Sequence, residues 1–86
     1  MQRPWVTSSA YAAAIGVIVR LRQEQGLSQR ALAERLGKPR SFVSKIENKE
    51  RRLDLVELAV IARAMGLSAE AVMSEVAAAL PDEIDF

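Results

Sequence analysis

The three residues Gly-Leu-Ser occur twice in the chain, at 26–28 and again at 66–68. Glycine readily adopts the left-handed conformation that closes a helix, and a serine hydroxyl accepts a hydrogen bond from a free amide in the first turn of the next helix. The leucine between them can pack against that first turn. Each copy therefore predicts the end of one helix and the start of another.

Other residues mark the remaining helix boundaries. Asp54 and Glu57 match a capping box, and Gly37 followed by Pro39 supplies a stop and a new start. Nothing alternates like a strand, and apolar residues recur at helical steps of three and four. The predicted helices are 9–25, 29–36, 40–48, 55–65 and 69–80. We expect their inward faces to contain Tyr11, Ala14, Ile15, Ile18, Leu21, Leu32, Ala33, Leu36, Val43, Ile46, Leu55, Leu58, Ile61, Ala62, Met65, Val72, Met73, Val76 and Leu80.

These helices define one all-α domain at 9–80, with an amino-terminal arm at 1–8 and an acidic tail at 81–86. The 86 residues include no cysteine and no histidine, which excludes disulfides, zinc fingers, thiol nucleophiles and a Ser-His-Asp triad. An enzyme would need a carboxylate pair in a cleft, but the acids are scattered, and no cofactor motif is present. The longest apolar run, 11–19, is about half of the ~20 residues of a membrane span. With no signal peptide evident, we expect a cytoplasmic, nucleoid-associated protein without membrane contact.

Charge is distributed unevenly along the chain, although the formal net charge is only +1. Residues 20–52 hold ten basic and four acidic side chains, whereas residues 53–86 hold one basic and seven acidic ones. One part of the molecule should therefore attract polyanions while the other repels them. Such polarity is typical of a protein that orients itself on nucleic acid.

The two short helices 29–36 and 40–48 lie in this basic part and are joined by a tight turn that contains glycine. This is the helix-turn-helix arrangement, in which the second helix reaches base edges in a major groove. Val43 and Ile46 should point inward, which leaves an outward face without acidic residues. That face consists of Arg40, Ser41, Ser44 and Lys45.

The string GLSQRALAERLGKPRSFVSKIE at 26–47 resembles the helix-turn-helix core of the XRE family, the Cro and lambda-repressor type of bacterial and phage DNA-binding domains. The resemblance extends from about residue 15 to residue 73. Proteins of this kind are mostly transcriptional regulators that bind palindromic operators as homodimers. The resemblance implies a compact, lambda-repressor-like bundle of five helices.

The resemblance also implies roles for individual residues. Arg40, Ser41, Ser44 and Lys45 match base-reading positions, and an arginine fork can bridge guanine O6 and N7. Arg22 and Glu47 match a partly buried ion pair that ties the first helix to the third. Gln29 matches a glutamine that holds a phosphate and supports the recognition helix. The residues expected to contact phosphates are Gln29, Arg30, Lys38, Asn48, Lys49, Arg51 and Arg52.

Two positions depart from the family pattern. Lys38-Pro39 stands where the family commonly has a capping serine or threonine, and proline suits a first helical position. Lys49 stands where the family prefers glycine. If Lys49 adopts a positive φ, it costs about 1 kcal/mol. Alternatively, Asn48 takes that conformation or the turn differs.

Several apolar side chains have no obvious inward role, and they suggest a dimer patch near the acidic part. They are Val17, Val19, Val56, Val60 and parts of 76–80, together with Trp5, Val6, Ile84 and Phe86. A two-fold dimer would place two recognition helices about 34 Å apart on DNA. Alternatively, the amino-terminal segment and the last helix simply cover the core of a monomer. The tail should lie away from DNA or dock on a partner subunit.

These features predict a non-enzymatic, sequence-specific regulator of transcription that binds double-stranded DNA without a cofactor. In this interpretation a homodimeric repressor occupies a palindromic operator through helix 40–48. One alternative is an antitoxin that binds DNA and also holds a toxin with its acidic helix or tail. Another is a protein-interaction module without DNA affinity, for which Arg40 and Lys45 would be dispensable.

Overall fold

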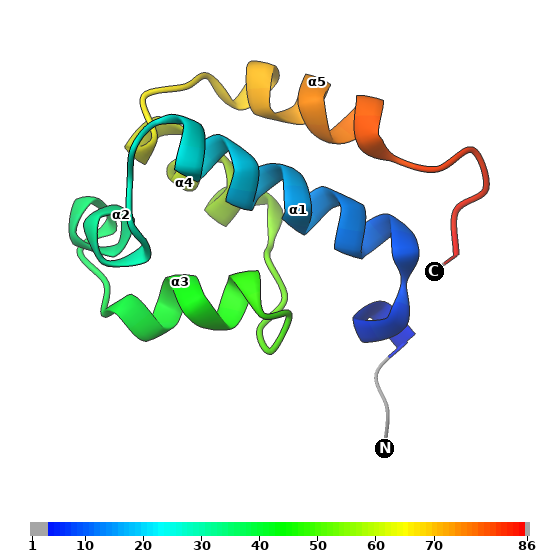
Figure 1. Cartoon of the computed structure of the whole chain (residues 1–86), viewed down its shortest axis with the longest axis horizontal. Helices are drawn as coiled ribbons and strands as arrows, with labels where there is room; N and C mark the ends of the chain where they lie inside the picture. Colours follow the sequence, from blue (N-terminus) through cyan, green and yellow to red (C-terminus); the bar gives the residue numbers. More distant parts are fainter. Residues whose placement is uncertain (1–3, 86) are drawn as a thin grey trace.

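The computed structural model describes residues 4–85 (Figure 1). A short 3-10 helix, η1 (Pro4–Thr7), precedes α1 (Ser9–Glu24), α2 (Gln29–Leu36), α3 (Arg40–Glu47), α4 (Leu55–Ala64) and α5 (Ala69–Ala79). The predicted all-α class with five α-helices is confirmed, and no strand occurs between residues 4 and 85. Helix α1 packs against α5 on one side and α3 on the other, while α2 packs against both α3 and α4 (Figure 1). No helix in the described part is long and apolar enough to cross a membrane.

The helix starts form at the predicted residues. Side chains of Ser28, Asp54 and Ser68 each accept a hydrogen bond from the backbone amide three residues later. Asp54 and Glu57 form the complete capping box. Four of the five helices start where predicted and end one residue earlier, and the helix predicted at 29–36 has those bounds. Local capping chemistry therefore sets the boundaries, because each cap satisfies amides that have no partner within the helix.

Four helices end in the same left-handed turn, and one of them lacks glycine. Gly26, Gly37 and Gly66 have φ angles of 71°, 67° and 78°, and Lys49 has a φ of 61°. After α3 the Lys49 amide donates to the Ile46 carbonyl at 3.1 Å, and the next amide donates to the Lys45 carbonyl at 2.8 Å. Of the two residues considered for this turn, Lys49 takes the strained conformation. Its side chain carries a cost of about 1 kcal/mol that glycine would avoid.

Most of the expected inward residues form the core, but three positions were predicted wrongly. Leu55 is 82% exposed and Met73 is 45% exposed, although both were expected inward. Leu55 is exposed because it is the first residue of α4. Met73 follows Val72, which faces the core, so its own side chain points to a different side of α5. Val17 was expected on the surface and is only 5% exposed. Because α3 and α5 cover α1 from two sides, its buried face is wider than one apolar stripe.

The carboxyl-terminal tail folds back onto the start of α1 (Figure 1). The Asp85 carboxylate accepts hydrogen bonds from the amides of Ser9 and Ala10, at 2.9 and 3.2 Å, and from the hydroxyls of Ser8 and Ser9, at 3.3 and 3.0 Å. Free amides at a helix start favour an anion. These bonds, led by the Ser9 amide, lower the pKa of Asp85 from 3.8 to about 2. The tail thus docks on its own chain.

The docked tail should therefore lose its anchor only in strong acid. The lowered pKa means that ionised Asp85 stabilises docking above pH 3.8, and that this contribution disappears as the pH falls through about 2. In an NMR titration, the Ser9 amide shift should follow this ionisation with a midpoint near pH 2. Asp85→Asn should abolish the titration, whereas Asp82→Asn, an exposed change in the same tail, should preserve it. A Ser9 midpoint near pH 3.8 would contradict the docking.

Candidate nucleic-acid interface

Helix α3 is anchored by its apolar face. Val43 and Ile46 are 3% and 1% exposed and pack into the core beside Leu32 and Ala33 of α2. Pro39 occupies the position before the first helical residue, with extended backbone angles, and no side chain caps α3. The predicted start of this helix at residue 40 is therefore confirmed, with Pro39 as the residue just before it. Arg40 begins the helix, so its side chain projects from the first turn.

The side chains of Arg22, Glu47 and Gln29 join three helices in one polar network. The Arg22 guanidinium from α1 contacts both Glu47 carboxylate oxygens, through Nε at 2.7 Å and a terminal nitrogen at 3.0 Å. Its other terminal nitrogen donates to the Leu27 carbonyl at 2.7 Å. Gln29 from α2 donates its side-chain amide to Glu47 at 2.8 Å. The two charged side chains are only 10% and 6% exposed, so this paired geometry fixes α3 against α1 and α2.

The outward face of α3 lies opposite the buried side chains of Val43 and Ile46. Arg40, Ser41 and Lys45 are exposed, and Ser44 is partly buried. The Ser44 hydroxyl donates to the Ser41 carbonyl at 3.3 Å, a local contact within the helix. Glu47 is the only acidic residue of α3, and it points toward Arg22. As a result, the outward face presents two cations and two hydroxyls.

The described cations fall into two groups, those whose side chains bind a carboxylate or carbonyl of the protein and those whose side chains do not. Arg20 pairs with Glu24 and Glu75 on the α1 and α5 surface, and Arg35 donates to the Ala64 carbonyl at 2.9 Å. Within residues 4–85, no carboxylate or carbonyl pairs with the side chains of the second group, which belong mainly to α2, α3 and the turn after α3. This second group is Arg30, Lys38, Arg40, Lys45, Lys49, Arg52 and, on α4, Arg63. Unpaired cations retain their full attraction for an external polyanion.

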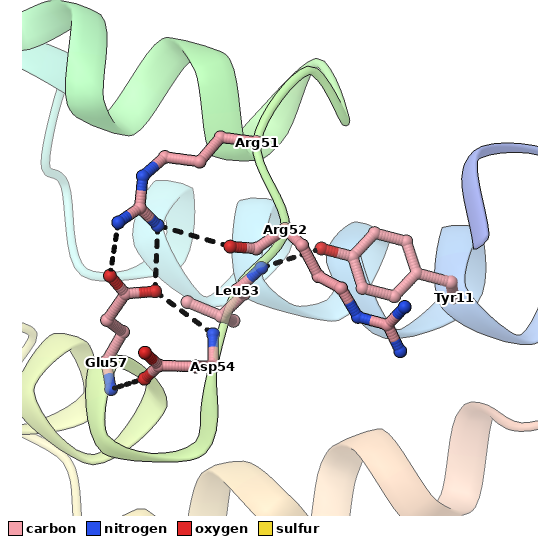
Figure 2. Close-up of polar contacts among 6 residues, drawn as sticks. All are labelled: Tyr11, Arg51, Arg52, Leu53, Asp54 and Glu57. Atoms are coloured by element: carbon pink, nitrogen blue, oxygen red, sulfur yellow. Dashed lines mark hydrogen bonds and ion pairs between the residues drawn. The ribbon is translucent and has the colours of Figure 1, made fainter. Parts of the chain in front are cut away.

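The loop after α3 is held by ion pairing and capping together (Figure 2). Arg51 binds Glu57 with both terminal nitrogens, at 2.8 and 2.6 Å, and also donates to the Arg52 carbonyl. The Arg51 guanidinium lowers the pKa of Glu57, and the Glu57 carboxylate raises that of Arg51. The Leu53 amide donates to the Tyr11 hydroxyl at 3.0 Å. Arg51, predicted to contact phosphate, is thus engaged within the protein.

The other predicted phosphate-contacting residues have different surroundings. Arg52 extends toward Tyr11 of α1 (Figure 2). Its guanidinium lies 5.7 Å from the ring centroids of Trp5 and Tyr11. The Asn48 amide donates to Glu50 at 3.5 Å, and the Lys38 ammonium lies 5.6 Å from the Phe42 ring. Arg30 and Lys49 are without such contacts in the described chain. The structure therefore separates loop-stabilising cations from those that face solvent.

Neither the Arg51 to Glu57 pair nor the docking of Asp85 is predicted by the sequence pattern. Glu57 carried a visible signal as the third residue of a capping box, but its second partner lies across an irregular loop. Asp85 binds residues 75 to 77 positions away, and no periodic pattern relates residues that far apart. Only the tertiary fold brings these groups together.

Comparison with known proteins agrees with this geometry. A family model described as Helix-turn-helix matches residues 18–72, which include α2, α3 and the helices that support them. This chain belongs to the helix-turn-helix family of the XRE type, whose members are DNA-binding proteins and not enzymes.

Solved structures that are similar to this chain include two with the following likeness. An XRE-family like protein from Pseudomonas syringae pv. tomato str. DC3000 shares 41% identity, with a TM-score of 0.77, over 85% of this chain and 89% of that one. The clp gene regulator ClgR from C. glutamicum has a TM-score of 0.72 and 24% identity, over 83% of this chain and 92% of that one. This second likeness concerns the fold alone. Among curated proteins, none matches the chain.

Breaking the buried ion pair should destabilise the whole domain. Glu47→Ala leaves the Arg22 charge poorly solvated and removes the acceptor of the Gln29 hydrogen bond. The free energy of unfolding, measured in urea, should therefore fall by about 3 to 5 kcal/mol. Glu24→Ala is the matched control, because its ion pair with Arg20 is exposed and screened by solvent, so the loss should be much smaller. Equal losses for the two variants would remove the anchoring role from this network.

Proposed function

We propose that this protein is a sequence-specific transcriptional regulator that places α3 in the major groove of DNA. The observation that carries the proposal is the outward face of α3, where Arg40 and Lys45 are exposed and unpaired within the described chain. Helix α3 is held rigidly behind that face by the pair of Arg22 and Glu47. A rigid, cationic helix that projects from a small domain suits recognition of base edges.

Base reading is assigned to the first turns of α3. Arg40 offers a planar fork that fits guanine O6 and N7, and such a pair discriminates by about 1 to 3 kcal/mol. Lys45 offers a second donor, while Ser41 and Ser44 supply hydroxyls that donate or accept. Because all four lie on one helix face, they can address adjacent base pairs in one groove.

Phosphate contacts are assigned to exposed or partly exposed residues around α3. Arg30, Lys38, Asn48 and Lys49 flank the helix from both ends, so they are positioned for the two backbones that border a groove. Such contacts anchor the protein and make binding salt-dependent without reading sequence. Gln29 supports Glu47 by donating one hydrogen bond from its side-chain amide. Arg51 is bound to Glu57, and Arg52 lies beside Trp5 and Tyr11. We therefore assign Gln29, Arg51 and Arg52 to shaping the interface rather than to contacting phosphates.

The proposed regulator is a homodimer that represses by occupying a palindromic operator. The dimer surface is reduced from the predicted patch, because Val17 and Val76 are buried and Val19 packs on the core. The side chain of Val6 and the residue Phe86 lie outside the described part. Exposed apolar side chains remain on α4, and we place the contact there. They are Leu55, Val56 and Val60, at 82%, 71% and 43% exposure. A regulator that acts on DNA in this way works in the cytoplasm, at the nucleoid.

Two arginine variants test the division between reading and anchoring. The test duplex is the one that the protein enriches from random DNA. Arg40→Ala should reduce the free energy of binding to it by about 1 to 3 kcal/mol and relax the base preference at one position. Arg30→Ala should weaken target and non-target duplexes alike and reduce the salt slope by about 1. Both effects are measured by fluorescence anisotropy over a series of salt concentrations.

Arg20→Ala is the charge-matched control. It also removes one positive charge, but Arg20 lies on the α1 and α5 side and is paired with Glu24 and Glu75, so affinity should be unchanged. Identical behaviour of the Arg40 and Arg30 variants would refute the division of roles. An Arg40 variant with full affinity and unchanged base preference would refute base reading by Arg40, and absence of specific DNA binding by the unaltered protein would favour a protein-interaction module instead.

A further inference from the structure

A largely apolar pocket opens where the amino-terminal turn, the start of α1 and the docked tail meet. Its volume is about 330 Å³, which lies within the range of small-molecule sites. Trp5 comes from η1, Tyr11 and Ala14 come from α1, and Leu80 and Ile84 come from the tail side. Arg52, from the loop after α3, is the one cation in the lining within residues 4–85. Four segments distant in sequence therefore build a single concave site.

The walls of this pocket are fixed before any ligand arrives. The rings of Trp5 and Tyr11 meet edge to face, with centroids 5.2 Å apart. The Tyr11 hydroxyl accepts a hydrogen bond from the Leu53 amide, and this bond ties the ring to the loop that carries Arg52. On the opposite wall, the hydrogen bonds of Asp85 hold the tail and so position Ile84. Such preorganisation lowers the entropic cost of binding.

Arg52 supplies an unused hydrogen-bonding fork at this pocket. Its guanidinium lies 5.7 Å from both aromatic rings, and within residues 4–85 no carboxylate or carbonyl accepts from it. The adjacent Arg51 differs, because both of its terminal nitrogens are bound to Glu57. A guanidinium has five donors in a planar arrangement that matches a carboxylate. An anionic group of a ligand would complete these contacts.

The surrounding groups favour one negative charge over two. Among the lining residues that the structure describes, Arg52 is the only cation, and the Ser8 hydroxyl there already donates to Asp85. The ionised Asp85 carboxylate binds Ser8 and Ala10 at the same end, and it would repel a doubly charged phosphate. The remaining lining is apolar and aromatic, which suits a hydrocarbon ring or chain.

We propose that this pocket binds a small amphipathic monocarboxylate, with the carboxylate on the Arg52 guanidinium and the apolar portion among Trp5, Tyr11 and Ile84. The pocket is separate from the outward face of α3. Binding is therefore measured without DNA, and its failure would leave the proposed DNA contact untouched.

Trp5 is the only tryptophan of the chain and lines the pocket, so its fluorescence reports occupancy directly. Titration of the full chain with 3-phenylpropionate should give a saturable change in the millimolar range or tighter at about 0.15 M salt. The neutral analogue 3-phenylpropanamide and the dianionic phenyl phosphate should each bind about tenfold more weakly or worse. Amide shifts in an NMR titration should cluster at Tyr11, Arg52 and Ile84.

Two arginine variants complete the test. Arg52→Gln should weaken 3-phenylpropionate about tenfold or more, because the charged fork is lost. Arg63→Gln removes a charge from α4, outside the pocket, and should bind as the unaltered protein does. Circular dichroism verifies that both variants fold. The proposal is overturned by an absence of saturation at about 10 mM, by equal binding of the amide, or by an Arg52 variant with unchanged affinity. Stronger binding of phenyl phosphate would assign the pocket to phosphorylated ligands instead.

Discussion

The buried pair of Arg22 and Glu47 is the interaction on which the arrangement of α3 depends. Burying two charges is costly, and the structure offsets this cost with two contacts between them and further bonds from Arg22 to Leu27 and from Gln29 to Glu47. The pair has a second effect. Because it turns the only acid of α3 inward, it leaves the outward face without negative charge. One interaction thus sets both the orientation of α3 and the electrostatics of its exposed surface.

The division of cations follows the same logic across the molecule. The cations that stabilise the fold form ion pairs with carboxylates, as Arg51 does with Glu57 and Arg20 does with Glu75. Those around α3 are left without acidic partners in the described chain, at the cost of some mutual repulsion. Lys49 shows a related compromise, because it accepts a strained left-handed backbone where glycine would be relaxed. A charge beside α3 is retained at the expense of stability.

How far the sequence predicts the structure depends on the range of the forces involved. Caps and left-handed turns are local, so the helix boundaries were predicted to within a residue. Burial depends on which neighbours cover a helix, and for this reason Val17 and Leu55 were misplaced. Ion pairs across loops depend on the finished fold, so the binding partners of Arg51 and Asp85 carried no periodic signal. For the site, α3 and its outward residues follow from local pattern, whereas the separation of free from engaged cations required the structure.

The central claim is that the outward face of α3 reads DNA sequence. It is tested most directly by selecting bound fragments from a random duplex pool at about 0.15 M salt and scoring the enriched motif for symmetry. The account predicts a palindromic motif whose half-sites lie about ten base pairs apart, the spacing of two recognition helices in a two-fold dimer. Absence of enrichment, or weak binding that salt abolishes for all sequences equally, would contradict it.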